Sequence, residues 1–111
     1  MQSISISGKK TQIRLTRGDS FYAIVSMTRS DEPYAPQEGD VIRFAMKKSY
    51  SSADVLLEKT IPTDTLLLAL YPEDTKELDF GAYVFDVELT TAGGDVDTFI
   101  CGELILEKEV K

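Results

Sequence analysis

Acidic side chains are the residues of this chain most able to do chemistry, and many occur as close pairs. The sequence has 111 residues, including 19 Asp and Glu but no histidine. Because histidine is the usual general base and a common metal ligand, catalysis would have to use paired carboxylates or a Ser–Lys arrangement. The acidic pairs, at 31–32, 38–40, 73–74 and 95–97, fall in predicted loops or outward strand positions. None belongs to a catalytic motif, so we expect solvated charge, no catalytic residues and no enzymatic activity.

A metal site is the second kind of chemistry that the acidic pairs could support. Asp95 and Asp97 follow Gly93-Gly94 in a predicted hairpin and could offer oxygens to Ca²⁺. Since Ca²⁺ needs six to eight ligands, two carboxylates are weak evidence. We predict no metal and no cofactor.

The single cysteine, Cys101, excludes an intrachain disulfide. A reactive thiol needs a nearby basic group that favours the thiolate, whereas the residues around Cys101 are apolar or acidic. We therefore predict that Cys101 is a small buried residue on a strand.

The charge balance argues against two classes of partner. The formal net charge is −7, and the basic clusters are only the pairs Lys9-Lys10 and Lys47-Lys48. Nucleic-acid binding requires clustered Lys and Arg, so neither nucleic acid nor an anionic membrane is an expected partner. No segment approaches the ~18 apolar residues of a membrane helix, and residues 1–8 lack the features of a signal peptide. We expect synthesis and folding in the cytoplasm.

Alternating apolar and polar residues predict an all-β chain. With 42% hydrophobic residues and this length, we expect one domain spanning 1–111. Arg17-Gly18-Asp19 reads as a turn, 29–40 as a loop and 92–95 as a hairpin, and Gly102 suggests a bulge. A one-turn helix is expected near 72–78, with Asp74 as its cap and Glu77 completing a capping box. The predicted strands are 2–7, 11–16, 21–28, 41–47, 55–60, 65–71, 83–89 and 96–107.

The segment 78–83 decides between a sandwich and a small barrel. Its Leu-x-x-Gly-x-Tyr spacing is that of a tyrosine corner, in which the Tyr83 hydroxyl bonds to backbone a few residues upstream and Gly81 permits the tight approach. Phe85 stands where antibody domains carry a bridge cysteine, so we expect it to pack with Phe44 and Val25 in place of a disulfide. The predicted fold is an immunoglobulin-like antiparallel β-sandwich of about seven to eight strands without a disulfide.

Several apolar residues are expected at the surface and form the candidate interface. Tyr22 and Ile24 fall on the face opposite Phe21 and Val25, while Tyr34 and Tyr50 lie in predicted loops. Tyrosine is favoured at protein and carbohydrate interfaces because it is flat and amphipathic. Residues 2–7 form a further candidate, as an edge strand that could pair with a neighbour.

The order of these segments resembles a known family. An Arg-Gly-Asp-Ser turn (17–20) precedes an apolar strand, and Gly39-Asp40 leads into Val-Ile-Arg-Phe-Ala-Met-Lys. Gly-Ala-Tyr-Val-Phe-Asp-Val-Glu-Leu, a Gly-Gly turn and Thr-Phe-Ile-Cys-Gly-Glu-Leu-Ile-Leu complete the series. The pattern is similar to the immunoglobulin-like modules of phage and prophage virion proteins, notably the N-terminal domain of baseplate upper proteins from phages of Gram-positive hosts. A long region typically follows such a domain, so a stand-alone protein, a fragment and a different family all stay open.

The resemblance implies a non-catalytic structural module of a tail or baseplate, docked to other virion proteins or to itself as an oligomer and located in the virion. The alternative is a ligand-binding module for carbohydrate or a cell surface that uses Tyr22, Tyr34 or Tyr50.

Overall fold

The computed structural model describes residues 4–29 and 31–108, and within them the chain forms ten strands and one short helix. The elements in chain order are β1 (Ile4–Ile6), β2 (Gly8–Thr16), β3 (Phe21–Val25), β4 (Thr28–Arg29), β5 (Glu32–Pro33), β6 (Val41–Lys47), β7 (Leu57–Ile61), β8 (Leu67–Leu70), α1 (Pro72–Thr75), β9 (Gly81–Thr90) and β10 (Val96–Glu107). The prediction of an all-β chain is confirmed. No helix in the described part is long and apolar enough to cross a membrane.

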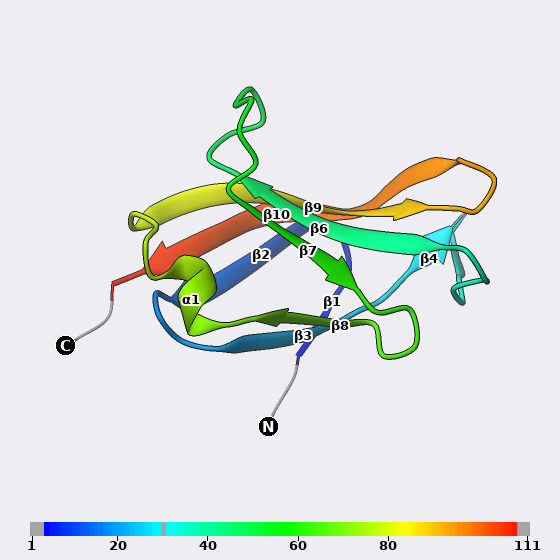
Figure 1. Cartoon of the computed structure of the whole chain (residues 1–111), viewed down its shortest axis with the longest axis horizontal. Helices are drawn as coiled ribbons and strands as arrows, with labels where there is room; N and C mark the ends of the chain where they lie inside the picture. The colour runs from blue at the N-terminus through cyan, green and yellow to red at the C-terminus, as the bar shows by residue number, and fades with distance from the viewer. Residues whose placement is uncertain (1–3, 30, 109–111) are drawn as a thin grey trace.

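Two sheets face each other across the core (Figure 1). One has three strands in the order β1-β3-β8, and the other has five in the order β2-β10-β9-β6-β7. Alternate residues of β3, β6, β8 and β9 point inward, so Val25 and Leu68 meet Phe44 and Phe85 in one buried cluster. The small β4-β5 hairpin begins at Thr28 and otherwise falls in 29–40, which was predicted to be loop throughout.

The expectation of wholly antiparallel sheets is wrong for two strand pairs. β1 runs parallel to β3, and β2 runs parallel to β10. The turn after β2 reverses the chain, so β3 runs antiparallel to β2. Since β1 is parallel to β3, β1 is also antiparallel to β2, and the chain reverses sharply between β1 and β2. Gly8, with a φ of +82°, permits this reversal. The Thr11 hydroxyl closes it by donating to the Ser7 carbonyl at 2.6 Å.

The short helix begins differently from its prediction. Asp74 is not the N-cap; Tyr71 is, and Pro72 occupies the first turn. The Asp74 carboxylate instead accepts the Tyr71 backbone N–H at 2.7 Å. Proline starts the helix early because its fixed φ suits the first helical position and its missing N–H costs nothing there.

The predicted core around Tyr83 is assembled by β9. The Tyr83 hydroxyl donates to the Asp79 carbonyl at 2.5 Å, which is the upstream backbone bond that the sequence predicted. Gly81 has a φ of +135°, a conformation that favours glycine. Phe44, Phe85 and Val25 are all buried, with the two phenylalanine ring centroids 5.5 Å apart.

Irregular pairing of β10 explains why Cys101 was misplaced. Its register shifts against β9 between Thr98 and Ile100, and against β2 between Ile100 and Gly102. Phe99 and Ile100 are therefore both buried, and Cys101 is only partly buried, opposite Asp86. The predicted irregularity near Gly102 is confirmed. A Cβ added to Gly102 would lie 1.7 Å from the Thr11 carbonyl oxygen, so β10 approaches β2 closely only because this residue is glycine.

Candidate interaction surface

The outer surface of the three-stranded sheet carries apolar residues. In a sheet with one face in water, apolar and polar residues would instead alternate along each strand. In β3, Ala23 and Val25 point into the core while Tyr22 and Ile24 point outward. In β8, Leu68 and Leu70 point inward while Leu67 and Ala69 point outward. Strands that are apolar on both faces are typical of sheets covered on both sides. The apolar face is therefore defined as Tyr22, Ile24, Leu67, Ala69 and Tyr71.

Direct cross-strand pairing makes the apolar face continuous. Tyr22 lies opposite Ala69, and Ile24 lies opposite Leu67. Tyr71 extends the face beyond the end of β8, with its ring edge-on to Tyr22 at a centroid distance of 6.1 Å and 41% of its surface exposed. The β1 residue on this side is the exposed, uncharged Ser5. None of the outward residues of β1, β3 and β8 that the structure describes is charged, so charge does not oppose burial of this surface.

The free edge of β8 adjoins the apolar face. The Val25 N–H donates to the Leu66 carbonyl at 2.9 Å, and bonded pairs alternate along an antiparallel ladder. The Leu66 carbonyl and the backbone groups of Leu68 and Leu70 therefore face β3, whereas the Leu66 N–H donates to the Pro62 carbonyl at 2.9 Å. The backbone groups of Ala69 face away from β3. A cavity of about 260 Å³ lies at this edge, lined by Leu67, Ala69 and Tyr71 on one side and by Lys59 and Thr60 on the other.

Lys59 and Asp74 form the polar boundary of this edge. Their side chains make an ion pair at 2.8 Å, and the Lys59 ammonium lies 5.4 Å from the centre of the Tyr71 ring. These contacts hold Tyr71 between β7 and α1. The edge strand β7 itself carries Glu58 and Lys59, as is usual for edges that resist pairing, whereas β8 carries no charge.

The four predicted interface residues separate into three places. Tyr22 and Ile24 lie together on the apolar face. The Tyr34 ring packs against the core and its hydroxyl donates to Asp40 at 2.7 Å. Tyr50 lies in the β6–β7 loop, residues 48–56, which projects from the five-stranded sheet on the side away from the core (Figure 1).

Tyr34 and Asp40 stabilise the loop that they close. The pKa of Asp40 is lowered, chiefly because its carboxylate accepts a hydrogen bond from the Gln37 backbone N–H. The hydrogen bond from the Tyr34 hydroxyl lowers this pKa further. The same hydrogen bond raises the pKa of Tyr34. This geometry favours a local structural role for Tyr34, and its role at an interface stays a prediction.

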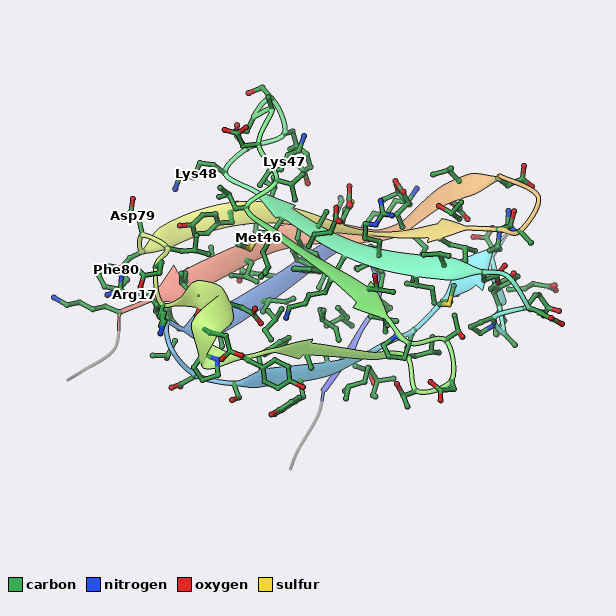
Figure 2. All side chains as sticks on the ribbon, in the orientation of Figure 1. Arg17, Met46, Lys47, Lys48, Asp79 and Phe80 are labelled. Atoms are coloured by element: carbon green, nitrogen blue, oxygen red, sulfur yellow. The ribbon has the colours of Figure 1, made fainter. Side chains whose placement is uncertain are left out.

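One end of the molecule gathers the Arg-Gly-Asp turn and the segment before β9 (Figure 2). Arg17 lies over the Phe80 ring at 4.0 Å and donates to the Leu78 carbonyl at 3.0 Å. The Gly18 N–H donates to the buried Thr75 hydroxyl at 3.1 Å. Lys48 lies 4.7 Å from the centre of the Tyr83 ring. The predicted turn is therefore bonded to the rest of the fold.

The pKa of Tyr83 is raised, chiefly by burial of its side chain and secondly by the nearby Asp79 charge.

The predicted hairpin carboxylates do not form a metal cluster in the described residues. Asp97 pairs with Arg29 at 3.4 Å instead. Within 4–29 and 31–108, no three or more His, Cys, Asp or Glu side chains gather closely enough to hold a metal ion.

Sequence reasoning missed Leu67, Ala69 and Tyr71. Residues 65–71 were recognised as a strand without an assigned outer face. The signal that could have identified them is the unbroken apolar run Leu66-Leu67-Leu68-Ala69-Leu70, which leaves no polar face for solvent.

Comparison with known proteins shows a likeness of fold. No family model matches the chain, and no curated protein matches it. Among solved structures, the chain is similar to the N-terminal domain of phage TP901-1 ORF48, with a TM-score of 0.54 and 15% sequence identity. The alignment covers 96% of this chain and 95% of that domain. At this identity the likeness concerns the fold.

Proposed function

We propose that this chain is a non-catalytic structural module of a phage or prophage virion, in its tail or baseplate, and that its apolar face docks it onto another virion protein or a second copy. The observation that carries the proposal is the apolar face. Five outward positions on neighbouring strands and at the end of β8 carry Tyr, Ile, Leu or Ala in a chain with 28% charged residues. A contiguous apolar surface of this kind is typical of a protein interface.

The likeness to a phage domain favours a virion as the assembly. It spans nearly the whole of both chains, which also supports 1–111 as one module. The resemblance of the strand and turn pattern to baseplate upper proteins favours the same assembly.

The immunoglobulin-like assignment belongs to this proposal. An immunoglobulin variable-type sandwich joins its third, sixth and seventh strands and an added strand in one sheet, and its second and fifth strands in the other. The order β10-β9-β6-β7 opposite β3-β8 corresponds to this arrangement. The parallel pairing of β1 with β3 and the absence of a disulfide depart from it.

The proposal can be tested in particles of the phage or prophage that encodes the chain. The double variant Tyr22→Asp/Ile24→Asp places two charges on the apolar face. Arg43→Asp, on the outer side of the five-stranded sheet, changes the net charge by the same amount and is the matched control. We expect the double variant to be soluble and folded but absent from purified particles, and Arg43→Asp to be incorporated like the wild type.

Immunoblots of gradient-purified particles, with circular dichroism of the isolated variants, distinguish the outcomes. Normal incorporation of a folded double variant would exclude the apolar face as the docking surface. Absence of the wild-type chain from purified particles would exclude the virion role itself.

The alternative function, ligand binding, is favoured by one separate observation, a pocket beside Tyr50.

A further inference from the structure

A second concave site lies on the opposite side of the molecule from the apolar face. It is a cavity of about 210 Å³ on the outer surface of the five-stranded sheet, lined by Ala45 and Lys47 of β6, Val84 and Asp86 of β9, and Tyr50. We refer to it as the sheet-face pocket. Its volume is below the range of sites for drug-sized ligands, so it fits a single small ring.

Adjacent strands build the floor of the sheet-face pocket. Ala45 lies directly opposite Asp86, and Lys47 lies opposite Val84. The short side chains of Ala45 and Val84 therefore alternate with one acidic and one basic side chain across two strands. The result is a small apolar floor with a hydrogen-bond acceptor and a donor at diagonal corners.

Tyr50 forms the wall, and a hydrogen-bonded turn encloses its backbone. The loop 48–56 rises from the end of β6, with Lys47 at its base (Figure 2). A turn bond from the Ser52 N–H to the Ser49 carbonyl at 3.1 Å encloses Tyr50, and the Ser49 hydroxyl contacts those of Ser51 and Ser52 at 3.2 and 3.0 Å. Tyr50 nevertheless leaves 68% of its surface exposed.

The two charged groups of the pocket are available to a ligand. In the part of the chain that the structure describes, neither the Lys47 ammonium nor the Asp86 carboxylate makes a hydrogen bond or ion pair. Their neighbours Arg43 and Glu58 instead approach each other at 3.9 Å. Asp86 is half-buried, and this burial raises its pKa, although the Lys47 charge acts in the opposite direction. A half-buried carboxylate without a partner gains from a ligand hydroxyl that donates to it.

These features match the chemistry of a sugar ring. A pyranose has a flat face of C–H groups that stacks on an aromatic ring, and its hydroxyls both donate to carboxylates and accept from ammonium groups. We propose that the sheet-face pocket binds one pyranose residue of a glycan, stacked on Tyr50 and hydrogen-bonded to Asp86 and Lys47. This site is independent of the assembly role, because it lies on the other sheet and uses none of the apolar face.

Amide NMR titration of the folded chain with methyl glycosides tests the proposal. The probes are methyl glucoside, galactoside, mannoside and rhamnoside, and N-acetylglucosamine. We expect at least one to shift the amides of Ala45 and Val84 with a Kd on the order of 1 mM, typical of a weak single-site ligand. Tyr50→Ala and Asp86→Asn should each weaken binding about tenfold. Tyr71→Ala, which removes an exposed tyrosine from the apolar face, should leave binding unchanged.

Three outcomes would overturn the proposal. The first is no shift at these amides with any glycoside at about 50 mM, well above a millimolar Kd. The second is equal binding by the wild type, Tyr50→Ala and Asp86→Asn. The third is a response to glycine alone, because a small zwitterion would satisfy Lys47 and Asp86 without stacking on Tyr50. None of these results would alter incorporation into particles, so failure here is distinguishable from failure of the assembly role.

Discussion

The outer surfaces of the two sheets differ more than their inner surfaces do. Both sheets contribute fully buried residues to one core, such as Leu70 from the three-stranded sheet and Phe44 from the five-stranded one. On the outside, the five-stranded sheet presents Arg43, Asp86 and Glu88 across β6 and β9, whereas the three-stranded sheet presents the apolar face. Folding requires only the inner surfaces. The proposed docking of the apolar face rests on this contrast between the two outer surfaces.

Removing an inner side chain should have the largest effect and would show whether the two sheets share one core. Phe44→Ala should lower the free energy of unfolding by about 3–5 kcal/mol, because it leaves a cavity between Phe85 and its neighbours. Denaturant unfolding monitored by circular dichroism measures this. Arg43→Ala, one residue away on the outer surface, should change the value by less than about 0.5 kcal/mol. A neutral Phe44→Ala would remove that residue from the core.

Deleting the hydrogen bond of the Tyr83 hydroxyl should lower the free energy of unfolding less than deleting a packed core side chain does. Tyr83→Phe deletes the hydroxyl that donates to Asp79 and should cost about 0.5–1.5 kcal/mol, the net contribution of one hydrogen bond. Equilibrium unfolding in urea is the measurement. If Tyr83→Phe lowered the free energy of unfolding as much as Phe44→Ala, the whole segment before β9 would depend on this hydrogen bond.

Substitution on the apolar face should affect stability less still. Leu67→Thr removes a partly buried outward side chain opposite Ile24 and should change the free energy of unfolding by less than about 1 kcal/mol. Thermal unfolding checks this, and incorporation into particles checks the functional effect. If Leu67→Thr destabilised the isolated chain as strongly as Phe44→Ala, the apolar face would be a second core and not an interface.

The smallest effect concerns pH and the charged outer surface. Burial raises the pKa of Asp86 in the folded state above its value in the unfolded chain. The folded state therefore binds this proton more tightly, and the contribution to stability is present at low pH and lost as pH rises through the folded pKa. Wild type should gain stability relative to Asp86→Asn as pH falls from about 7 to about 4. Melting temperatures of both proteins over this range test the sign, and a constant difference would contradict it.

The alternation of apolar and polar residues predicted which side chains are buried, but it did not predict how the strands pair or where their register shifts. Alternation identifies the inner face of each strand, so Phe44, Phe85, Val25 and Tyr83 were placed correctly in the core. Alternation carries no information about which strand pairs with which. The parallel pairing of β1 with β3 and of β2 with β10 was therefore not predicted. Alternation also fails where a register shift inverts the faces, as at Cys101.

The candidate surface was predicted in part for a related reason. Tyr22 and Ile24 were found because they oppose clearly inward residues in β3. Leu67 and Ala69 were missed because every residue from Leu66 to Leu70 is apolar, so periodicity could not separate the two faces. The sheet-face pocket depends on a loop returning over two strands, and no local pattern encodes such a meeting; only Tyr50 was anticipated.

The parallel pairing of β2 with β10 also determines how the chain bears mechanical load. The two strands pair along most of β2, from Gly8 beside Ile100 to Thr16 beside Glu107. In a parallel pair, the start of β2 and the end of β10 lie at opposite ends of the ladder. Tension applied through these two strand ends therefore shears all of the inter-strand hydrogen bonds together and does not unzip them one at a time.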